Sequence, residues 1–314
     1  MSLLIAFSGQ GLQDANMFKM LAEDDFGRQW LNDASQQIGL ELQDKKIVAQ
    51  YCHDTVYAQL FLTVLSVGSY QALIQKTGLS PQLLCGYSLG ELSAYAASAR
   101  LSIKELCSLS YKRAELMQQV TTEVAAGESC GLVALKGNID LNSAQRLSTR
   151  FNCPIAIINA DDHYILGGLA THLELLLNEA KSHGVRTTKR LEVNLPSHTP
   201  LLIKATDAFL SSLEHYQHYV MHIPILNSLT NELISSSKEM IPILAKELSQ
   251  TLHWNKVMKL APEYGTDIFL ELGAGSSLKK MYLAENAQCR AYSLDDFATI
   301  NGLSHFILKH FEKP

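Results

Sequence analysis

The sequence has little that would indicate an extracellular, metal-stabilised or membrane-spanning protein. Its six cysteines form no C-x-x-C pair and have no histidine partners at zinc-binding spacing, which argues against a disulfide framework and a structural metal site. Polar residues and a glycine interrupt the longest apolar stretch, 60–74, which is shorter than the roughly 20 apolar residues that a membrane span needs. We therefore expect a protein of the reducing cytoplasm, without a membrane span.

An excess of basic charge and an N-terminal targeting signal are also lacking. The 26 lysines and arginines are outnumbered by 31 aspartates and glutamates, so the formal net charge of −5 offers no basic field for nucleic acid or anionic lipid. No basic segment precedes the first apolar residues, so 3–7 is better interpreted as a strand than as part of a signal peptide. Partners must be sought through a specific site.

What is present is the composition of a folded α/β protein. Of the 314 residues, 47% are hydrophobic and 18% are charged, which excludes intrinsic disorder. This length fits two domains or one domain with an insertion. Apolar runs bounded by turn residues alternate with segments of helical periodicity, which predicts parallel strands joined by helices. The predicted core strands are 3–7, 82–86, 223–227 and 267–272, and the predicted long helices are 56–77, 89–99, 103–120, 200–213, 241–252 and 299–311.

The segment from about residue 130 to residue 193 has a different order of elements. Its strands are predicted at 131–135, 155–159, 164–167 and 186–193, and its helices at 142–150 and 170–183. This β-α-β-β-α-β order is typical of a ferredoxin-like unit. We predict a large core made of residues 1–125 and 198–314, interrupted by a small subdomain of residues 126–197.

The strongest local motif is G-x-S-x-G at residues 86–90, between a predicted strand and a predicted helix. This is the setting of a nucleophile elbow, in which glycines leave room for a sharp turn that exposes the Ser88 hydroxyl. The same turn directs the Leu89 amide and the helix dipole toward a developing oxyanion. The alternative is a glycine-rich turn in which the serine is incidental.

A serine hydroxyl needs a base within hydrogen-bond reach to become a nucleophile. Of the eleven histidines, His198 is the best placed, because it follows the predicted small subdomain, although it could equally be a turn or helix-cap residue. Gln10, after the first strand, is a candidate second oxyanion donor, since loops after parallel strands share one sheet edge. The glycine-rich segments 9–11 and 273–275 lack the remaining residues of a phosphate-binding loop, and we interpret the second as a tight turn.

Five segments occur in the order seen in malonyl-CoA:acyl carrier protein transacylases, and the sequence resembles this family from end to end. They are FSGQGLQ (7–13), GYSLGE (86–91), KRAELMQ (112–118), PSH (196–198) and ELGAG (271–275). Five segments in order over more than 260 residues are far more specific than any single motif. The resemblance implies an α/β-hydrolase-like core with a parallel sheet and an inserted ferredoxin-like subdomain.

The resemblance also implies roles for matching residues. Ser88 would attack the thioester of malonyl-CoA and His198 would take its proton, while the Gln10 and Leu89 amides bind the oxyanion. Arg113 would bind the free malonyl carboxylate through two parallel hydrogen bonds, which a planar guanidinium can make and lysine cannot.

Further roles and partners follow from the same resemblance. Asn159 and Ser197 match substrate-binding positions, and the backbone carbonyl of Glu247 would orient the histidine. Because a carbonyl does the orienting, Glu247 in place of the usual glutamine need not harm it, although an inward carboxylate could raise the pKa of His198. The acceptor would be the phosphopantetheine thiol of an acyl carrier protein, with no bound metal or redox cofactor.

Several positions depart from the family pattern. Ser8 replaces proline, Tyr87 replaces histidine, Ala114 replaces glycine and His163 replaces glutamine, while residues 56–57 are Val-Tyr where Gln-Pro is common. The tyrosine before the nucleophile and the short chain resemble the branch that serves malonate decarboxylase as its epsilon subunit. The carrier would therefore belong either to fatty-acid synthesis or to malonate decarboxylase.

Two other functions remain open, as does the surface that receives the carrier. A serine esterase or thioesterase on a similar core would release free acid to water, and a non-catalytic docking scaffold would tolerate loss of Ser88 or His198. Carrier proteins are generally acidic, so an enzyme of net charge −5 needs local basic residues at its site entrance. Lys279, Lys280 and residues 189–190 are candidates, although they fit an ordinary solvated surface equally well.

Overall fold

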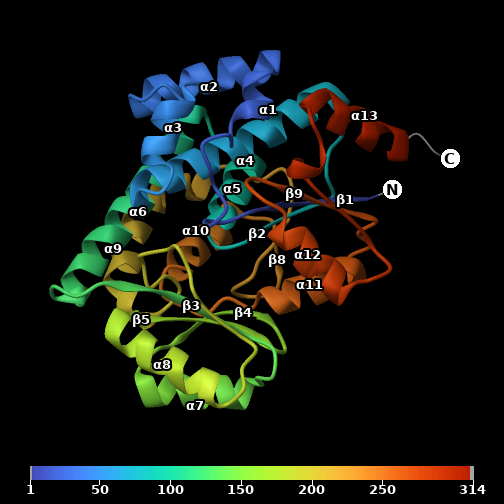
Figure 1. Cartoon of the computed structure of the whole chain (residues 1–314). Coiled ribbons are helices and arrows are strands. Elements are labelled where there is room, and N and C mark those ends of the chain that lie inside the picture. Colours follow the sequence, from blue (N-terminus) through green and yellow to red (C-terminus); the bar gives the residue numbers. More distant parts are fainter. Residues whose placement is uncertain (1, 312–314) are drawn as a thin grey trace.

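The computed structural model describes residues 2–311, which form two β-sheets and their covering helices (Figure 1). The strands are β1 (Leu3–Phe7), β2 (Leu83–Gly86), β3 (Cys130–Lys136), β4 (Ile155–Ala160), β5 (His163–Leu169), β6 (Thr187–Arg190), β7 (Ile225–Leu226), β8 (Leu233–Ile234), β9 (Ile268–Leu272) and β10 (Arg290–Ser293). The α-helices are α1 (Lys19–Ala22), α2 (Asp25–Ile38), α3 (Lys45–Tyr51), α4 (Thr55–Thr77), α5 (Leu89–Ser98), α6 (Ile103–Ala125), α7 (Leu141–Phe151), α8 (Ala170–Ser182), α9 (Ile203–Leu213), α10 (Ser237–Lys246), α11 (Trp254–Glu263), α12 (Ser277–Glu285) and α13 (Ile300–Phe311).

The larger sheet has the strand order β10-β9-β1-β2-β7-β8 and is parallel except for β8, which pairs antiparallel with β7. The chain is therefore an α/β protein with a mixed sheet. Phe7 at the end of β1 is level with Gly86 at the end of β2 and with Leu272 at the end of β9. The loops that follow these three strands consequently meet at one edge of the sheet, where parallel α/β sheets place their sites.

Alternating side chains of the larger sheet enter two different cores. Ile5, Leu84 and Leu270 pack with α4, α5 and α6 on one face, whereas Leu4 and Phe269 pack with α11 and α12 on the other. This division follows the two-residue period of a strand. Because both faces are covered, β1 is apolar throughout and Glu271 is the one charged residue of β9.

The smaller sheet has the order β4-β5-β3-β6 with antiparallel pairing, and it is built from the chain between β2 and β7. One face is covered by α7 and α8, and the other contributes Leu132, Ile157 and Ile165 to the core beneath the larger sheet. The Ile158 amide donates to the Leu252 carbonyl at 2.9 Å, so β4 is tied to the chain just before α11. Figure 1 shows this sheet with α7 and α8 at the end of the molecule opposite α1–α3.

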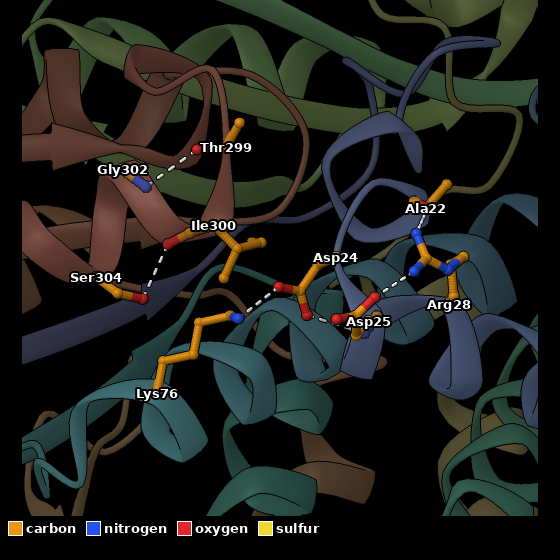
Figure 2. A network of polar contacts seen from close by, with 10 residues as sticks. Ala22, Asp24, Asp25, Arg28, Lys76, Thr299, Ile300, Gly302 and Ser304 are labelled. Carbon is orange, nitrogen blue, oxygen red and sulfur yellow. Dashed lines mark hydrogen bonds and ion pairs between the residues drawn. The ribbon is translucent and has the colours of Figure 1, made fainter.

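Helix α4 is the central helix of the larger core. By length and composition it is the one helix within residues 2–311 that could cross a membrane. Its apolar 18-residue segment is, however, 83% buried inside the protein. Asp24 ties the N-terminal helices to it: one carboxylate oxygen accepts from the Gly27 amide at 3.1 Å, and the other lies 2.7 Å from Lys76 Nζ (Figure 2). This is the cap expected at the start of α2.

Several predicted boundaries are wrong. Helix α10 ends at Lys246 rather than at 252, because the chain turns there and then bonds to β4. Strands β6 and β7 are shorter than predicted, and the antiparallel β8 was not predicted. Sequence periodicity also missed α1–α3, α11, α12 and β10. Strand β10 is a four-residue edge strand and gives a weak periodic signal. Helix α11 is amphipathic, with Trp254, Val257, Met258 and Ala261 buried, and the sequence analysis overlooked this pattern.

Candidate active site

Ser88 lies at the turn between β2 and α5, at the carboxyl edge of the larger sheet. Its backbone has φ 56° and ψ −115°, outside the regions that L residues ordinarily occupy. The flanking glycines make this turn possible. A Cβ on Gly86 would overlap the backbone of Gly90 and Glu91, and a Cβ on Gly90 would overlap the Phe7 carbonyl. The spacing G-x-S-x-G is therefore required by contact between β1, β2 and α5.

His198 is paired with this serine. Ser88 Oγ and His198 Nε2 are 2.7 Å apart, while His198 Nδ1 bonds to the backbone carbonyl of Glu247. Because a carbonyl can only accept, Nδ1 carries the proton and Nε2 is left to accept from the serine hydroxyl. His198 has no exposed surface, and its own amide donates to the Leu248 carbonyl at 2.8 Å. The turn after α10 therefore fixes both the position and the tautomer of the imidazole.

Burial and a neighbouring cation keep His198 neutral. Burial first, and the positive charge of Arg113 second, lower the pKa of His198 to about 3. Both causes disfavour the imidazolium, so the base form is available at neutral and mildly acidic pH. The charge of Arg113 therefore acts on the imidazole in the same direction as burial.

Arg113 is a buried cation with one neutral hydrogen-bond partner. It is 4% exposed on α6, and its Nη1 donates to Gln59 Oε1 of α4 at 2.6 Å. Burial lowers its pKa to about 10, which leaves it charged at neutral pH, and the nearby Glu247 opposes this shift. Gln59 was missed by the sequence analysis. The available signal was a glutamine near the start of a largely apolar helix, three residues after Val56, where the resembled family commonly has glutamine; the structure buries this side chain fully.

Two buried carboxyl groups, those of Glu91 and Glu247, accept hydrogen bonds from the consecutive residues Ser228 and Asn227 after β7. Glu91 of α5 has no exposed surface, and its Oε1 accepts from the Ser228 amide at 2.9 Å and from the Ser228 hydroxyl at 3.1 Å. Glu247 is 2% exposed, and its Oε1 accepts from Asn227 Nδ2 at 2.8 Å. Burial raises the pKa of Glu91 to about 8, and burial and the charge of Glu91 raise the pKa of Glu247.

Tyr87 joins the elbow to the smaller sheet. Its ring packs edge-on against Trp254 with centroids 5.3 Å apart. Burial raises the pKa of Tyr87 to about 12, and a hydrogen bond from Asn159 opposes this. Asn159 is buried on β4, and its Oδ1 has no partner within residues 2–311. Asn159 on β4 is therefore a neighbour of the tyrosine that precedes Ser88.

The other predicted site residues lie as follows. Leu89 is the first residue of α5, where backbone amides lack partners from the preceding turn. Gly9 packs on the elbow, since its Cβ position would be 3.6 Å from Ser88 Cβ, which brings the neighbouring Gln10 to the same edge. Ser197 is buried directly before His198. Lys279 pairs with Asp296 at 2.6 Å, so its charge is already compensated.

Two further points from the sequence concern the glycine-rich segment 273–275 and the expectation that there is no metal site. Gly273 and Gly275 both have positive φ, and a Cβ on Gly273 would overlap the Ser8 hydroxyl, in agreement with a tight turn. No group of three or more His, Cys, Asp or Glu side chains that could hold a metal ion occurs within residues 2–311.

An α/β sheet that presents a histidine-activated serine at its carboxyl edge is the arrangement of enzymes that form acyl-serine intermediates. The sequence profile of the acyl transferase domain family matches residues 5–287, and the chain belongs to that family.

Several relatives of this chain are named for the same reaction. The malonyl CoA-acyl carrier protein transacylase of Bacillus subtilis is 25% identical, with 96% of this chain and 76% of that protein covered. The transacylase of the same name from Haemophilus influenzae is 24% identical over 97% of this chain and 98% of that protein. The crystal structure of malonyl-CoA:acyl carrier protein transacylase from Helicobacter pylori superposes with a TM-score of 0.88, at 25% identity and full coverage of both chains.

Proposed function

We propose that this acyltransferase moves a malonyl group from malonyl-CoA to the phosphopantetheine thiol of an acyl carrier protein through a malonyl-serine intermediate. The observation that carries the proposal is the buried, charged Arg113 beside the Ser88–His198 pair. A guanidinium in that place suits an acyl group that ends in a carboxylate, and the named relatives are malonyl transacylases.

In the proposed first half-reaction, His198 Nε2 takes the proton of Ser88 Oγ while Oγ attacks the thioester carbon. The amides of Leu89 and Gln10 stabilise the oxyanion of the tetrahedral intermediate. The carbon–sulfur bond then breaks, and His198 returns the proton to the departing thiolate of coenzyme A. In the second half-reaction the carrier thiol gives its proton to His198 and attacks the malonyl-serine ester. The ester carbon–oxygen bond then breaks, and His198 returns the proton to Ser88 Oγ.

Arg113 supplies the proposed acid selectivity. It would donate two parallel hydrogen bonds to the malonyl carboxylate, with Asn159 and Ser197 as further substrate contacts. Glu247 holds the histidine through its backbone carbonyl, so no carboxylate is needed as a third catalytic member. The chemistry proposed for these residues needs no bound cofactor, and malonyl-CoA enters as substrate.

We further propose that the two sheets correspond to an α/β-hydrolase-like core of residues 1–125 and 198–314 and an inserted ferredoxin-like subdomain of residues 126–197. The reaction would take place in the cytoplasm. The carrier would be that of fatty-acid synthesis or that of malonate decarboxylase, and the rates of malonyl transfer to the two purified carriers would distinguish them.

Intact-protein mass spectrometry tests the covalent intermediate. The protein mixed with malonyl-CoA should gain the mass of one malonyl group, and the Ser88→Ala variant should gain none. Addition of a carrier with its phosphopantetheine arm should remove the adduct and produce malonyl-carrier. Release of free malonate in place of malonyl-carrier would instead favour the thioesterase alternative, and absence of any adduct on the unmodified protein would refute malonyl transfer.

Substitution of Arg113 tests the assigned specificity. Arg113→Ala should lower kcat/KM for malonyl-CoA by at least about a hundredfold, because it removes a charge-assisted bidentate contact, and should affect acetyl-CoA far less. Arg146→Ala, at an exposed position on α7, is the matched control. Equal losses with both substrates would show that Arg113 does not bind the carboxylate.

A further inference from the structure

The turn after β7 contains two consecutive polar residues that are fully buried, Asn227 and Ser228. The proposed mechanism uses neither of them. Asn227 Oδ1 accepts from the Leu229 amide at 2.8 Å and from the Thr230 amide at 2.9 Å, and these two bonds close the turn. Because Oδ1 is engaged in this way, the amide group of Asn227 has a fixed orientation, and Nδ2 is the atom that reaches another element.

Asn227 Nδ2 holds the end of helix α10. It donates at 2.8 Å to Oε1 of Glu247, which follows the last residue of that helix and is 2% exposed. The Glu247 amide donates to the Ile243 carbonyl at 3.0 Å, so its backbone continues the helix. The last carbonyls of a helix lack partners within it, and that of Glu247 accepts from His198 Nδ1 instead. The side chain of Glu247 is therefore anchored at the turn, while its carbonyl orients the base.

Ser228 connects the same turn to the nucleophile. Its amide and its hydroxyl donate to Oε1 of Glu91 on α5, at 2.9 Å and 3.1 Å, and α5 is the helix that Ser88 precedes. Strand β7, which leads into the turn, pairs with β2, which leads to Ser88. Two adjacent residues thus join the helix of the nucleophile to the helix end that orients its base. A misplacement of about 1 Å between reacting groups can cost about a hundredfold in rate, so this connection bears on catalysis.

We propose that Asn227 is a positioning residue for the base: through its hydrogen bond to the Glu247 side chain it holds the end of α10 in the place from which the carbonyl there orients His198. This inference rests on the proposed acyl transfer through Ser88. Asn227 acts through Glu247 and not through contact with the substrate. The bond requires an Oε1 acceptor at position 247, which glutamate and glutamine both supply, so the glutamate of this chain preserves the connection.

Two variants test the bond between Asn227 and Glu247. Asn227→Ser removes Nδ2 but keeps a side-chain oxygen that can close the turn. The double variant Asn227→Asp with Glu247→Gln keeps the bond and reverses its direction, because the glutamine then donates to the aspartate. Asn178→Ser, at an exposed position on α8, is the matched control. The measurement is the single-turnover rate of malonyl-serine formation at saturating malonyl-CoA, obtained by rapid quenching and intact-protein mass spectrometry.

Asn227→Ser should lower this rate by about tenfold to a hundredfold. The malonyl-CoA concentration that gives half of the maximal rate should change little, because the loss concerns the reacting groups and not binding. The double variant should recover most of the rate, and Asn178→Ser should retain all of it. An Asn227→Ser protein as fast as the unmodified one, or a double variant as slow as Asn227→Ser, would overturn the inference. Absence of any adduct on the unmodified protein would instead refute the proposed function.

A second test needs no substrate. The proton on His198 Nδ1 is buried and hydrogen-bonded to a carbonyl, so it should give a separate low-field nuclear magnetic resonance signal, identified by its absence in His198→Gln. This signal should shift or broaden in Asn227→Ser, return in the double variant and stay unchanged in Asn178→Ser. Circular dichroism establishes that each variant is folded. An unchanged His198 signal in folded Asn227→Ser would overturn the inference and leave the proposed malonyl transfer intact.

Discussion

The backbone conformation of Ser88 predicts that a glycine variant at this position is more stable than an alanine variant. Strain at a residue held in a sparsely populated φ/ψ region costs about 1–3 kcal/mol, and glycine avoids most of it. Ser88→Ala and Ser88→Gly both remove the hydroxyl that contacts His198, so the difference between them isolates the backbone. Glycine also makes the unfolded chain more flexible, which offsets about 0.5–1 kcal/mol of the gain. We expect Ser88→Gly to be more stable than Ser88→Ala by about 1 kcal/mol.

Glycine and alanine variants of Ser236 separate the backbone strain at Ser88 from the effect of helix capping. Ser236 precedes α10 as Ser88 precedes α5, and neither side chain forms a capping hydrogen bond, but Ser236 has φ −128° and ψ 129°. Glycine is a better N-cap than alanine, so Ser236→Gly and Ser236→Ala measure that contribution together with the flexibility of the unfolded chain. Urea unfolding monitored by circular dichroism gives all four free energies of unfolding. If the glycine–alanine difference is the same at both positions, the elbow is not strained.

Two further predictions concern pH. Since the pKa of His198 is lowered to about 3, kcat/KM for malonyl-CoA should not fall between pH 7 and about pH 5. An unshifted imidazole of pKa about 6.5 would cause a loss of roughly twenty-fivefold, and a pH–rate profile with such a loss would contradict the burial argument. Burial raises the pKa of Glu91 from 4.5 to about 8, so the folded protein holds the Glu91 proton more tightly than the unfolded chain does. This preference stabilises the folded state fully below pH 4.5. The stabilisation is lost as the pH rises to about 8, by at most about 1.4 kcal/mol per pH unit. Glu91→Gln should therefore reduce the fall in the free energy of unfolding across that range, and an unchanged slope would show that Glu91 ionises normally.

The turn at Ser88 could be predicted because the local sequence carries its geometry. Glycines on both sides of Ser88 are required by contacts within a few residues and with β1, so the motif itself indicates the turn. The structure brings His198 to this serine and the Glu247 carbonyl to His198, as the family resemblance implied. Periodicity alone gave no such pairing, since 110 residues separate Ser88 from His198.

The acidic part of the cluster could not be predicted in the same way. Glu91 follows the elbow in a helix where acidic residues near the N-terminus are ordinary, so nothing in the pattern indicated full burial. Asn227 and Ser228 are polar residues after a short strand and resemble a solvated turn. Their roles depend on the loop after β7 folding over α5, which is a long-range contact. Only the fold shows that the site contains more acidic groups than the motifs indicate.

The place of β1 in the larger sheet has a consequence for synthesis on the ribosome. This strand, the first to be made, lies between β2 and β9, and Leu3 pairs with Ile268. The ribosome adds about 5–20 residues per second, and domains generally fold as units during this synthesis. Pairing of segments that are distant in the sequence is slow. The four strands of the smaller sheet all lie between residues 130 and 190, so that sheet can form while the larger one still lacks β9. For much of translation the apolar β1 therefore lacks β9 as its second neighbour, and one edge of this strand stays unpaired until residues 268–272 have been made.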